Sequence, residues 1–136
     1  MTSSRPADEL VASARRSLTE ASIATTPAER YAAAHLAALR AAAAMLAARS
    51  RPTSRRARVR SVWTVLPQVA PELAEWCDFF AAGAGKRAAA EAGLACVSPR
   101  EADDLVREAD AFVARVAQAL GLAHQPSMAD ALLHVG

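Results

Sequence analysis

Apolar residues recur at spacings of three and four along the first part of the chain, which is the period of an α-helix with one buried face. One stripe includes Leu10, Ala14 and Leu18 and predicts a helix over residues 6–24. A second stripe predicts a helix over residues 27–49. Its members are Tyr31, His35, Leu39, Ala42 and Leu46.

Prolines that follow hydroxyl residues mark the starts of two helices. Thr26-Pro27-Ala28-Glu29 and Ser98-Pro99-Arg100-Glu101 both fit a capping box, in which the hydroxyl accepts a backbone bond and the glutamate returns one to the cap. The second box predicts a last long helix from Pro99 to Leu120, ended by Gly121. Its expected inward residues are Leu105, Ala109, Phe112, Val116 and Ala119.

The middle of the chain predicts a short helix followed by a longer one. Ser61 can cap a helix over residues 62–69, and a proline then opens a longer helix over residues 71–93. Two glycines lie inside the longer helix, at Gly83 and Gly85. They predict a kink or a close contact there, because glycine weakens a helix and lets a neighbour approach the backbone.

The composition agrees with an all-α fold. Alanine provides 37 of the 136 residues, whereas aromatic residues provide 4%. This composition favours helices packed on small side chains and argues against strands, which need β-branched and aromatic residues. We therefore expect an antiparallel up-and-down bundle of four long helices plus a short extra helix, forming one domain over residues 1–121, with a loosely ordered tail over 122–136.

The same sequence predicts a cytoplasmic protein outside the membrane. Two cysteines cannot form a disulfide framework, and the amino-terminal residues lack the apolar run of a secretion signal. The longest candidate membrane segment, Tyr31 to Ala48, is mostly alanine and is interrupted by His35 and Arg40. We expect no membrane partner.

Charge is distributed very unevenly along the chain. The net charge is +2, but residues 30–71 carry eight arginines and no acid, whereas the residues before and after them are acidic overall. Six of these arginines lie within residues 49–60, the arginine segment: Arg49, Arg51, Arg55, Arg56, Arg58 and Arg60. Such a density predicts binding of a nucleic-acid backbone, since arginine pairs with phosphate through two parallel bonds. A solvated surface loop is the alternative.

Other conspicuous residues favour structural roles. Trp63, Trp76 and two neighbouring phenylalanines have the spacing of core residues, with a base-stacking surface as the alternative. Neither Cys77 nor Cys96 has a basic or histidine neighbour in sequence that would activate a nucleophile. The acids at the start of the last helix, such as Asp103, are accounted for by the helix dipole. We predict no metal site and no cofactor.

The stretch from Ala28 to Ala44, AERYAAAHLAALRAAAA, resembles the alanine-rich second helix of HEPN domains, the "higher eukaryotes and prokaryotes nucleotide-binding" family. The stretches APELAEW, residues 70–76, and FFAAG, residues 79–83, are similar to a small stand-alone branch found in high-GC bacteria. The resemblance covers residues 8–121. It implies a helical bundle, often dimeric, in a family that includes RNA-cleaving toxins, RNA-binding modules and members without assigned activity.

The family's ribonucleases carry an arginine followed by a histidine a few residues later, and Arg30 and His35 share that order with four residues between them. Histidine and arginine side chains suit metal-independent RNA cleavage, which needs a base to accept a proton and a cation to stabilise the negative charge. However, the pair lies in the second helix and not in the last, and its members are roughly 140° apart around a helix, so a shared site requires a dimer or a bent path. The stripe through Tyr31 and Leu39 favours a core position for His35.

Three functions follow as expectations. The first is a non-catalytic module that binds RNA or another phosphate-rich partner through the arginine segment. The second is a ribonuclease that uses Arg30 and His35 across a homodimer, in which the alanines around Ala41 form the interface. The third is a protein-interaction bundle without a nucleic-acid role.

Overall fold

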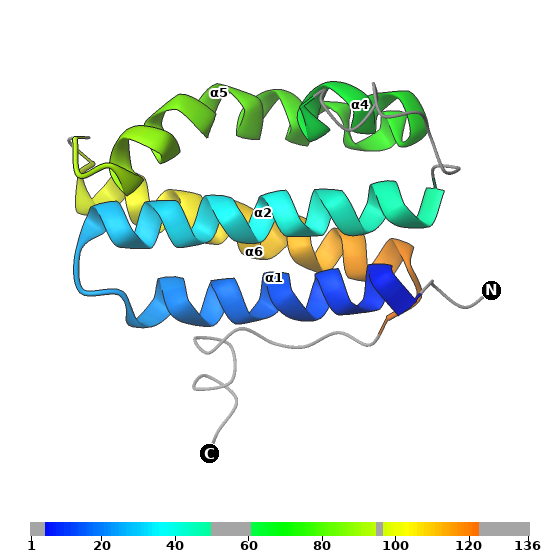
Figure 1. Cartoon of the computed structure of the whole chain (residues 1–136), viewed down its shortest axis with the longest axis horizontal. Coiled ribbons are helices and arrows are strands. Elements are labelled where there is room, and N and C mark those ends of the chain that lie inside the picture. Colours follow the sequence, from blue (N-terminus) through cyan, green and yellow to red (C-terminus); the bar gives the residue numbers. More distant parts are fainter. Residues whose placement is uncertain (1–4, 50–60, 95–96, 123–136) are drawn as a thin grey trace, which may run out of the picture.

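The computed structural model describes residues 5–49, 61–94 and 97–122, and most of these residues lie in helices (Figure 1). Four helices are long and one is short, and a single 3-10 turn, η1, spans Pro71–Leu73; the described ranges contain no strand. The expected all-α fold is therefore confirmed. The helices are α1 (Arg5–Ile23), α2 (Pro27–Arg49), α4 (Val62–Val69), α5 (Ala74–Glu91) and α6 (Pro99–Ala119).

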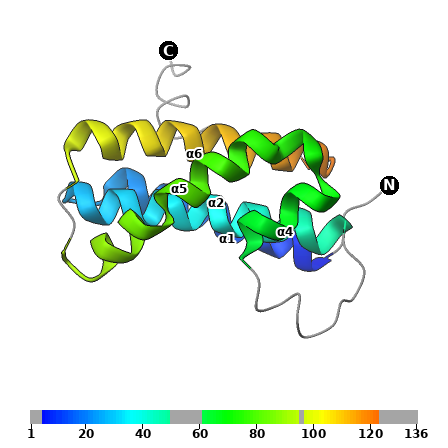
Figure 2. The ribbon, with the colours of Figure 1, turned by 90° about the horizontal axis from the view of Figure 1, so that it is seen from above.

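The long helices alternate in direction, as expected for an up-and-down bundle (Figure 1). Helices α2 and α6 pack against each other in the middle, α1 lies on one side of them, and α4 with α5 lies on the other. Figure 2 shows the same bundle from above, with α4 near the carboxyl end of α2. Arg49 and Ser61, where the described chain leaves α2 and enters α4, therefore lie at one end of the bundle.

The helix boundaries follow the local signals in the sequence. At the start of α6 a complete capping box forms: Glu101 N donates to Ser98 Oγ over 3.0 Å, and Ser98 N donates to Glu101 Oε1 over 3.1 Å. Thr26 Oγ1 accepts from the backbone amide of Glu29 at the start of α2, and Ser61 Oγ accepts from that of Trp63 at the start of α4. These bonds satisfy amides that the helices themselves leave free.

Helices α5 and α6 are each followed by a glycine, two residues after the last helical residue. Gly93 and Gly121 both have a φ of 74°, in the left-handed region that residues with a side chain rarely adopt. The predicted longer helix at residues 71–93 begins as the separate turn η1, after which α5 continues without a break through Gly83 and Gly85. The expected close contact is present at Gly83, where an added Cβ would lie 2.9 Å from Tyr31 Oη.

The core combines an alanine side with an aromatic side. On the alanine side, α1 packs on α2 through small residues, with Ala14 and Ala21 of α1 and Ala37, Ala41 and Ala44 of α2 fully buried. Because these side chains are short, the two backbones approach closely over their whole length. The aromatic side lies between α4, α5 and α6 and consists of Trp63, Trp76, Phe80 and Phe112.

The predicted helix faces require a correction. Leu10, Leu18 and Leu39 are only partly buried and lie at the margin of the core, while alanines fill its centre. Ala119, which was expected to face inward, is exposed. In this chain, size alone is therefore a poor guide to burial, because the closest helix contacts have no room for leucine.

Helix α2 is long and apolar enough to cross a membrane by length and composition, but half of the window that meets this test is buried inside the bundle. A central helix of a packed core passes the same test. The helix is therefore weak evidence for a membrane segment.

Candidate functional site

His35 lies in the core of the bundle, between α2 and α5. Its side chain is 1% exposed, and its Nε2 lies 2.8 Å from the carbonyl oxygen of Phe80. The rings of Trp63 and Phe80 approach it edge-on, with centroids 6.1 and 6.0 Å away. Because a carbonyl can only accept, Nε2 carries the proton and donates to Phe80, so Nδ1 carries the lone pair.

The Nδ1 atom of His35 is also buried, and no residue in the described part of the chain donates a hydrogen bond to it. Burial lowers the pKa of His35 below its ordinary value, and Arg87 lowers it further, while the bond to Phe80 and the charge of Glu91 act in the opposite direction. The neutral imidazole is therefore the form that the fold favours. Neither ring nitrogen is accessible to a substrate.

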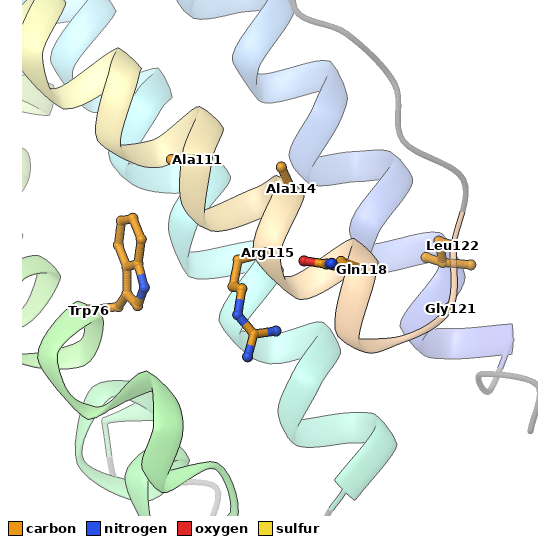
Figure 3. A pocket seen from close by; sticks show the side chains of 7 residues that line it. All are labelled: Trp76, Ala111, Ala114, Arg115, Gln118, Gly121 and Leu122. Carbon is orange, nitrogen blue, oxygen red and sulfur yellow. The ribbon is translucent and has the colours of Figure 1, made fainter.

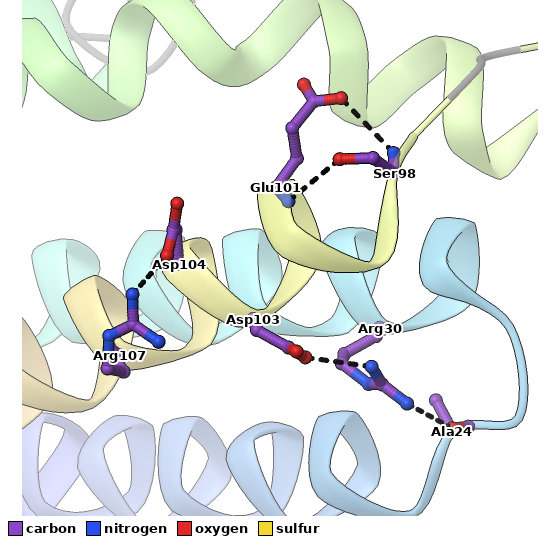
Figure 4. Close-up of polar contacts among 7 residues, drawn as sticks. All are labelled: Ala24, Arg30, Ser98, Glu101, Asp103, Asp104 and Arg107. Atoms are coloured by element: carbon purple, nitrogen blue, oxygen red, sulfur yellow. Dashed lines mark hydrogen bonds and ion pairs between the residues drawn. The ribbon is translucent and has the colours of Figure 1, made fainter.

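Arg30 lies in the first turn of α2, and its side chain reaches the start of α6 (Figure 4). Its Nη1 donates to Asp103 Oδ1 over 2.8 Å, and its Nη2 donates to the carbonyl of Ala24 over 3.3 Å. The guanidinium thereby ties α2 to α6 and to the turn that follows α1. Since His35 is bonded to α5, the structure directs the two residues to different neighbours and does not bring them together in one site.

Three acids of α6 each have their own cationic partner and are not gathered at one point. Asp103 pairs with Arg30, Asp104 pairs with Arg107, and Glu101 joins the capping box (Figure 4). Glu101 also pairs with Lys86 of α5. The bond from Lys86, followed by that from Ser98, lowers the pKa of Glu101. Over the described ranges, no three His, Cys, Asp or Glu side chains form a group that could hold a metal ion.

Cys77 is fully buried in α5, and burial, with a smaller contribution from Asp78, raises the pKa of its thiol to about 11. A thiol of that pKa is protonated at neutral pH and is therefore a poor nucleophile. Cys96 lies outside the described residues.

The arginine segment is described only at its first residue. Arg49 closes α2, and its Nη1 pairs with Glu72 Oε2 over 2.6 Å. Both side chains are about one-third exposed. Arg51, Arg55, Arg56, Arg58 and Arg60 lie outside the described residues.

A groove between α5 and α6 was not anticipated from the sequence. It is lined by Trp76 of α5 and by Ala111, Ala114, Arg115 and Gln118 of α6, together with the turn after α6 (Figure 3). Trp76 and Arg115 are far apart in the sequence and form no motif. The spacing along α6 could indicate only that Ala111, Arg115 and Gln118 share one face of a helix.

The alanine face proposed for a homodimer is used within the chain. Ala37, Ala41 and Ala44 are fully buried by the other helices, and Ala48 is partly buried. Large apolar side chains that are exposed within the described ranges lie elsewhere, at Ile23, Phe79 and Leu94.

Comparison with known proteins identifies a family. Residues 21–117 match the family model described as SAV_6107-like HEPN. This span includes α2, α4, α5 and nearly all of α6, and it is well over half of the chain. No curated protein and no solved structure gives a significant match.

Proposed function

The chain belongs to the SAV_6107-like HEPN family, and from this we propose that it is a non-catalytic helical module that binds RNA or another phosphate-rich partner through its arginine segment. The observation that carries the proposal is the charge distribution. Six arginines within residues 49–60 and no acid between residues 30 and 71 make this stretch of the sequence, the positive region, strongly basic, and α2 ends with Arg49 at one end of the bundle. Each phosphate contact there releases counterions, which favours binding.

The contacts of the described arginines narrow the proposal to five side chains. Arg30 pairs with Asp103, Arg40 donates to Ser17 Oγ over 2.7 Å, and Arg49 pairs with Glu72. These three arginines of the positive region already have partners within the fold. The phosphate-binding role is therefore assigned to the remaining five, Arg51, Arg55, Arg56, Arg58 and Arg60.

The burial of His35 supports a function without RNA cleavage. A general base must come within hydrogen-bond distance of the ribose hydroxyl, and both nitrogens of His35 are enclosed by α2, α4 and α5. Use of Arg30 and His35 across a dimer would require His35 to leave the core, with loss of its bond to Phe80. We therefore rank the ribonuclease below the binding module.

The test is the salt dependence of RNA binding. Fluorescence anisotropy with a labelled single-stranded RNA should show an affinity that falls linearly with salt on logarithmic axes. In the four-arginine variant, in which Arg55, Arg56, Arg58 and Arg60 become Ala, the slope should drop by up to about 3, because each lost contact removes roughly 0.7 for a single strand.

A matched control removes the same charge elsewhere. Arg5, Arg16, Arg100 and Arg107 are exposed and lie outside the positive region, so their joint replacement by Ala should change the slope much less. Equal losses in the two variants would show that only net charge matters. Unchanged binding in the four-arginine variant would contradict the proposal, and RNA cleavage by the parent that disappears in His35→Ala would favour the ribonuclease.

A further inference from the structure

The groove between α5 and α6 places a fixed aromatic ring beside a cation. Trp76 is nearly parallel to Phe80, with an interplanar angle of 11° and centroids 6.1 Å apart, and its centroid lies 5.4 Å from that of Phe112. These contacts hold the indole from the core side. The ring is only partly buried, and its remaining surface lines the groove (Figure 3).

Arg115 faces the same groove from α6 and is half-buried (Figure 3). Unlike those of Arg30, Arg49 and Arg107, its guanidinium makes no ion pair or hydrogen bond with the residues that the structure describes. Helix α6 packs beside α2 and runs in the same direction (Figure 1), so Arg115, near the carboxyl end of α6, lies toward the end of the bundle where Arg49 ends α2.

The remaining lining suits a flat ligand with polar edges. Ala111 and Ala114 have short side chains and leave space above the helix, and the amide of Gln118 can both donate and accept. A nucleotide base needs an aromatic face for stacking, polar groups at its edge and a cation for the adjoining phosphate.

We propose that this groove is a subsite for single-stranded RNA, in which one unpaired base stacks on Trp76 and its phosphate pairs with Arg115. This inference rests on the proposed function, since it extends the RNA path from the arginine segment onto the folded bundle. Double-stranded RNA does not fit the subsite, because its bases are stacked on one another and cannot reach the indole.

The experiment compares a labelled short oligoadenylate with a duplex RNA of the same length. Trp76→Ala should weaken binding of the single strand about 5- to 100-fold and leave the duplex unchanged, whereas Trp76→Phe should keep most of the affinity because it keeps a ring. Equal behaviour of Trp76→Ala and Trp76→Phe would overturn the inference.

Two further variants avoid the contacts that Trp76 makes with the core. Ala111→Leu fills the groove from an exposed position, and Arg115→Gln removes the cation, so both should reduce single-strand binding selectively. The matched control is Arg100→Gln, which makes the same charge change at the exposed start of α6. A control that weakens binding as much as Arg115→Gln would overturn the inference.

The indole N–H resonance of Trp76, followed by NMR, separates failure of the groove from failure of the arginine segment. We expect oligoadenylate to shift it in the parent and, at higher concentration, in the four-arginine variant. If the parent binds oligoadenylate without this shift, the arginine segment is the binding site and the proposal of a groove subsite is wrong. A shift with unchanged affinity in the four-arginine variant supports the groove and overturns the arginine segment. Absence of both binding and shift overturns both.

Discussion

The two sides of the bundle are packed by opposite means. On the alanine side, α1 and α2 are in contact along their length through fully buried alanines such as Ala14 and Ala41. On the aromatic side, α5 and α6 stand further apart, and Phe80 and Phe112 fill the space with ring centroids 5.2 Å apart. The difference shows which substitutions destabilise each side. The alanine side has no room for a larger side chain, whereas on the aromatic side a smaller side chain would leave a cavity.

The largest effect is expected when a charge is placed on the alanine side. Ala41→Glu should lower the free energy of unfolding by about 3–5 kcal/mol, because the carboxylate is buried without a partner. Ala47→Glu, at an exposed position of the same helix, should cost about 0.5 kcal/mol or less. Urea denaturation followed by circular dichroism measures both. A folded Ala41→Glu variant that shifts from dimer to monomer in sedimentation would instead place this face at an interface between chains.

A truncation on the aromatic side should have an effect of similar or slightly smaller size. Phe80→Ala removes a fully buried ring that contacts His35, Trp63, Trp76 and Phe112, and we expect a loss of about 3–4 kcal/mol in the free energy of unfolding. Phe79→Ala, the neighbouring residue, is a matched control because its ring is 47% exposed. Similar losses in the two variants would contradict the assignment of Phe80 to the core.

His35 links the two sides and should make the stability depend on pH. Its pKa is lowered in the folded protein, so the unfolded chain binds the proton more tightly. The stabilisation by neutral His35 is therefore present above about pH 6.5, the ordinary value, and is lost as the pH falls. At neutral pH, His35→Ala should cost about 1–3 kcal/mol through the cavity and the loss of the bond to the Phe80 carbonyl.

The pH dependence of the free energy of unfolding distinguishes stabilisation by neutral His35 from a simple loss of packing in the variant. Urea denaturation of the parent and of His35→Ala should differ most at neutral pH and less in mild acid. A difference that is constant with pH would mean that the protonation of His35 is not coupled to folding.

The smallest effect is expected at two glycines of α5. A Cβ at Gly83 would lie 2.9 Å from Tyr31 Oη and 3.4 Å from His35 Cδ2, whereas a Cβ at Gly85 would meet nothing within 4 Å. Gly85→Ala should therefore stabilise the protein by about 0.5–1 kcal/mol through helix propensity. Gly83→Ala should lose that gain, because the buried ring of Tyr31 must shift. Equal melting temperatures of the two variants would show that α5 does not press on α2 at Gly83.

The helix boundaries could be predicted from local signals, because caps and glycine stops act within one or two turns. Ser61, Pro27 and Ser98 each begin or cap a helix as expected. The inward faces were predicted less well, since the preference for alanine over Leu10 or Leu39 in the core depends on how closely the neighbouring helices approach.

The candidate site residues also divide into those that a local sequence pattern identifies and those that only the fold brings together. The arginine segment is visible in the sequence because it is a local run of charge, and its role in binding stays a prediction. The separation of Arg30 from His35 depends on partners in α6 and α5 that no local pattern identifies. The groove was missed for the same reason, since Trp76 and Arg115 meet only through the fold.

The aromatic cluster also determines what optical measurements report about this protein. Both tryptophans of the chain, Trp63 and Trp76, lie within this cluster, and the alanine side contains neither. Intrinsic tryptophan fluorescence therefore reports the packing of α4, α5 and α6 but is insensitive to α1, which contributes to the far-ultraviolet circular dichroism. Coincident unfolding curves from the two signals would show that the halves melt as one cooperative unit, and separate curves would resolve them.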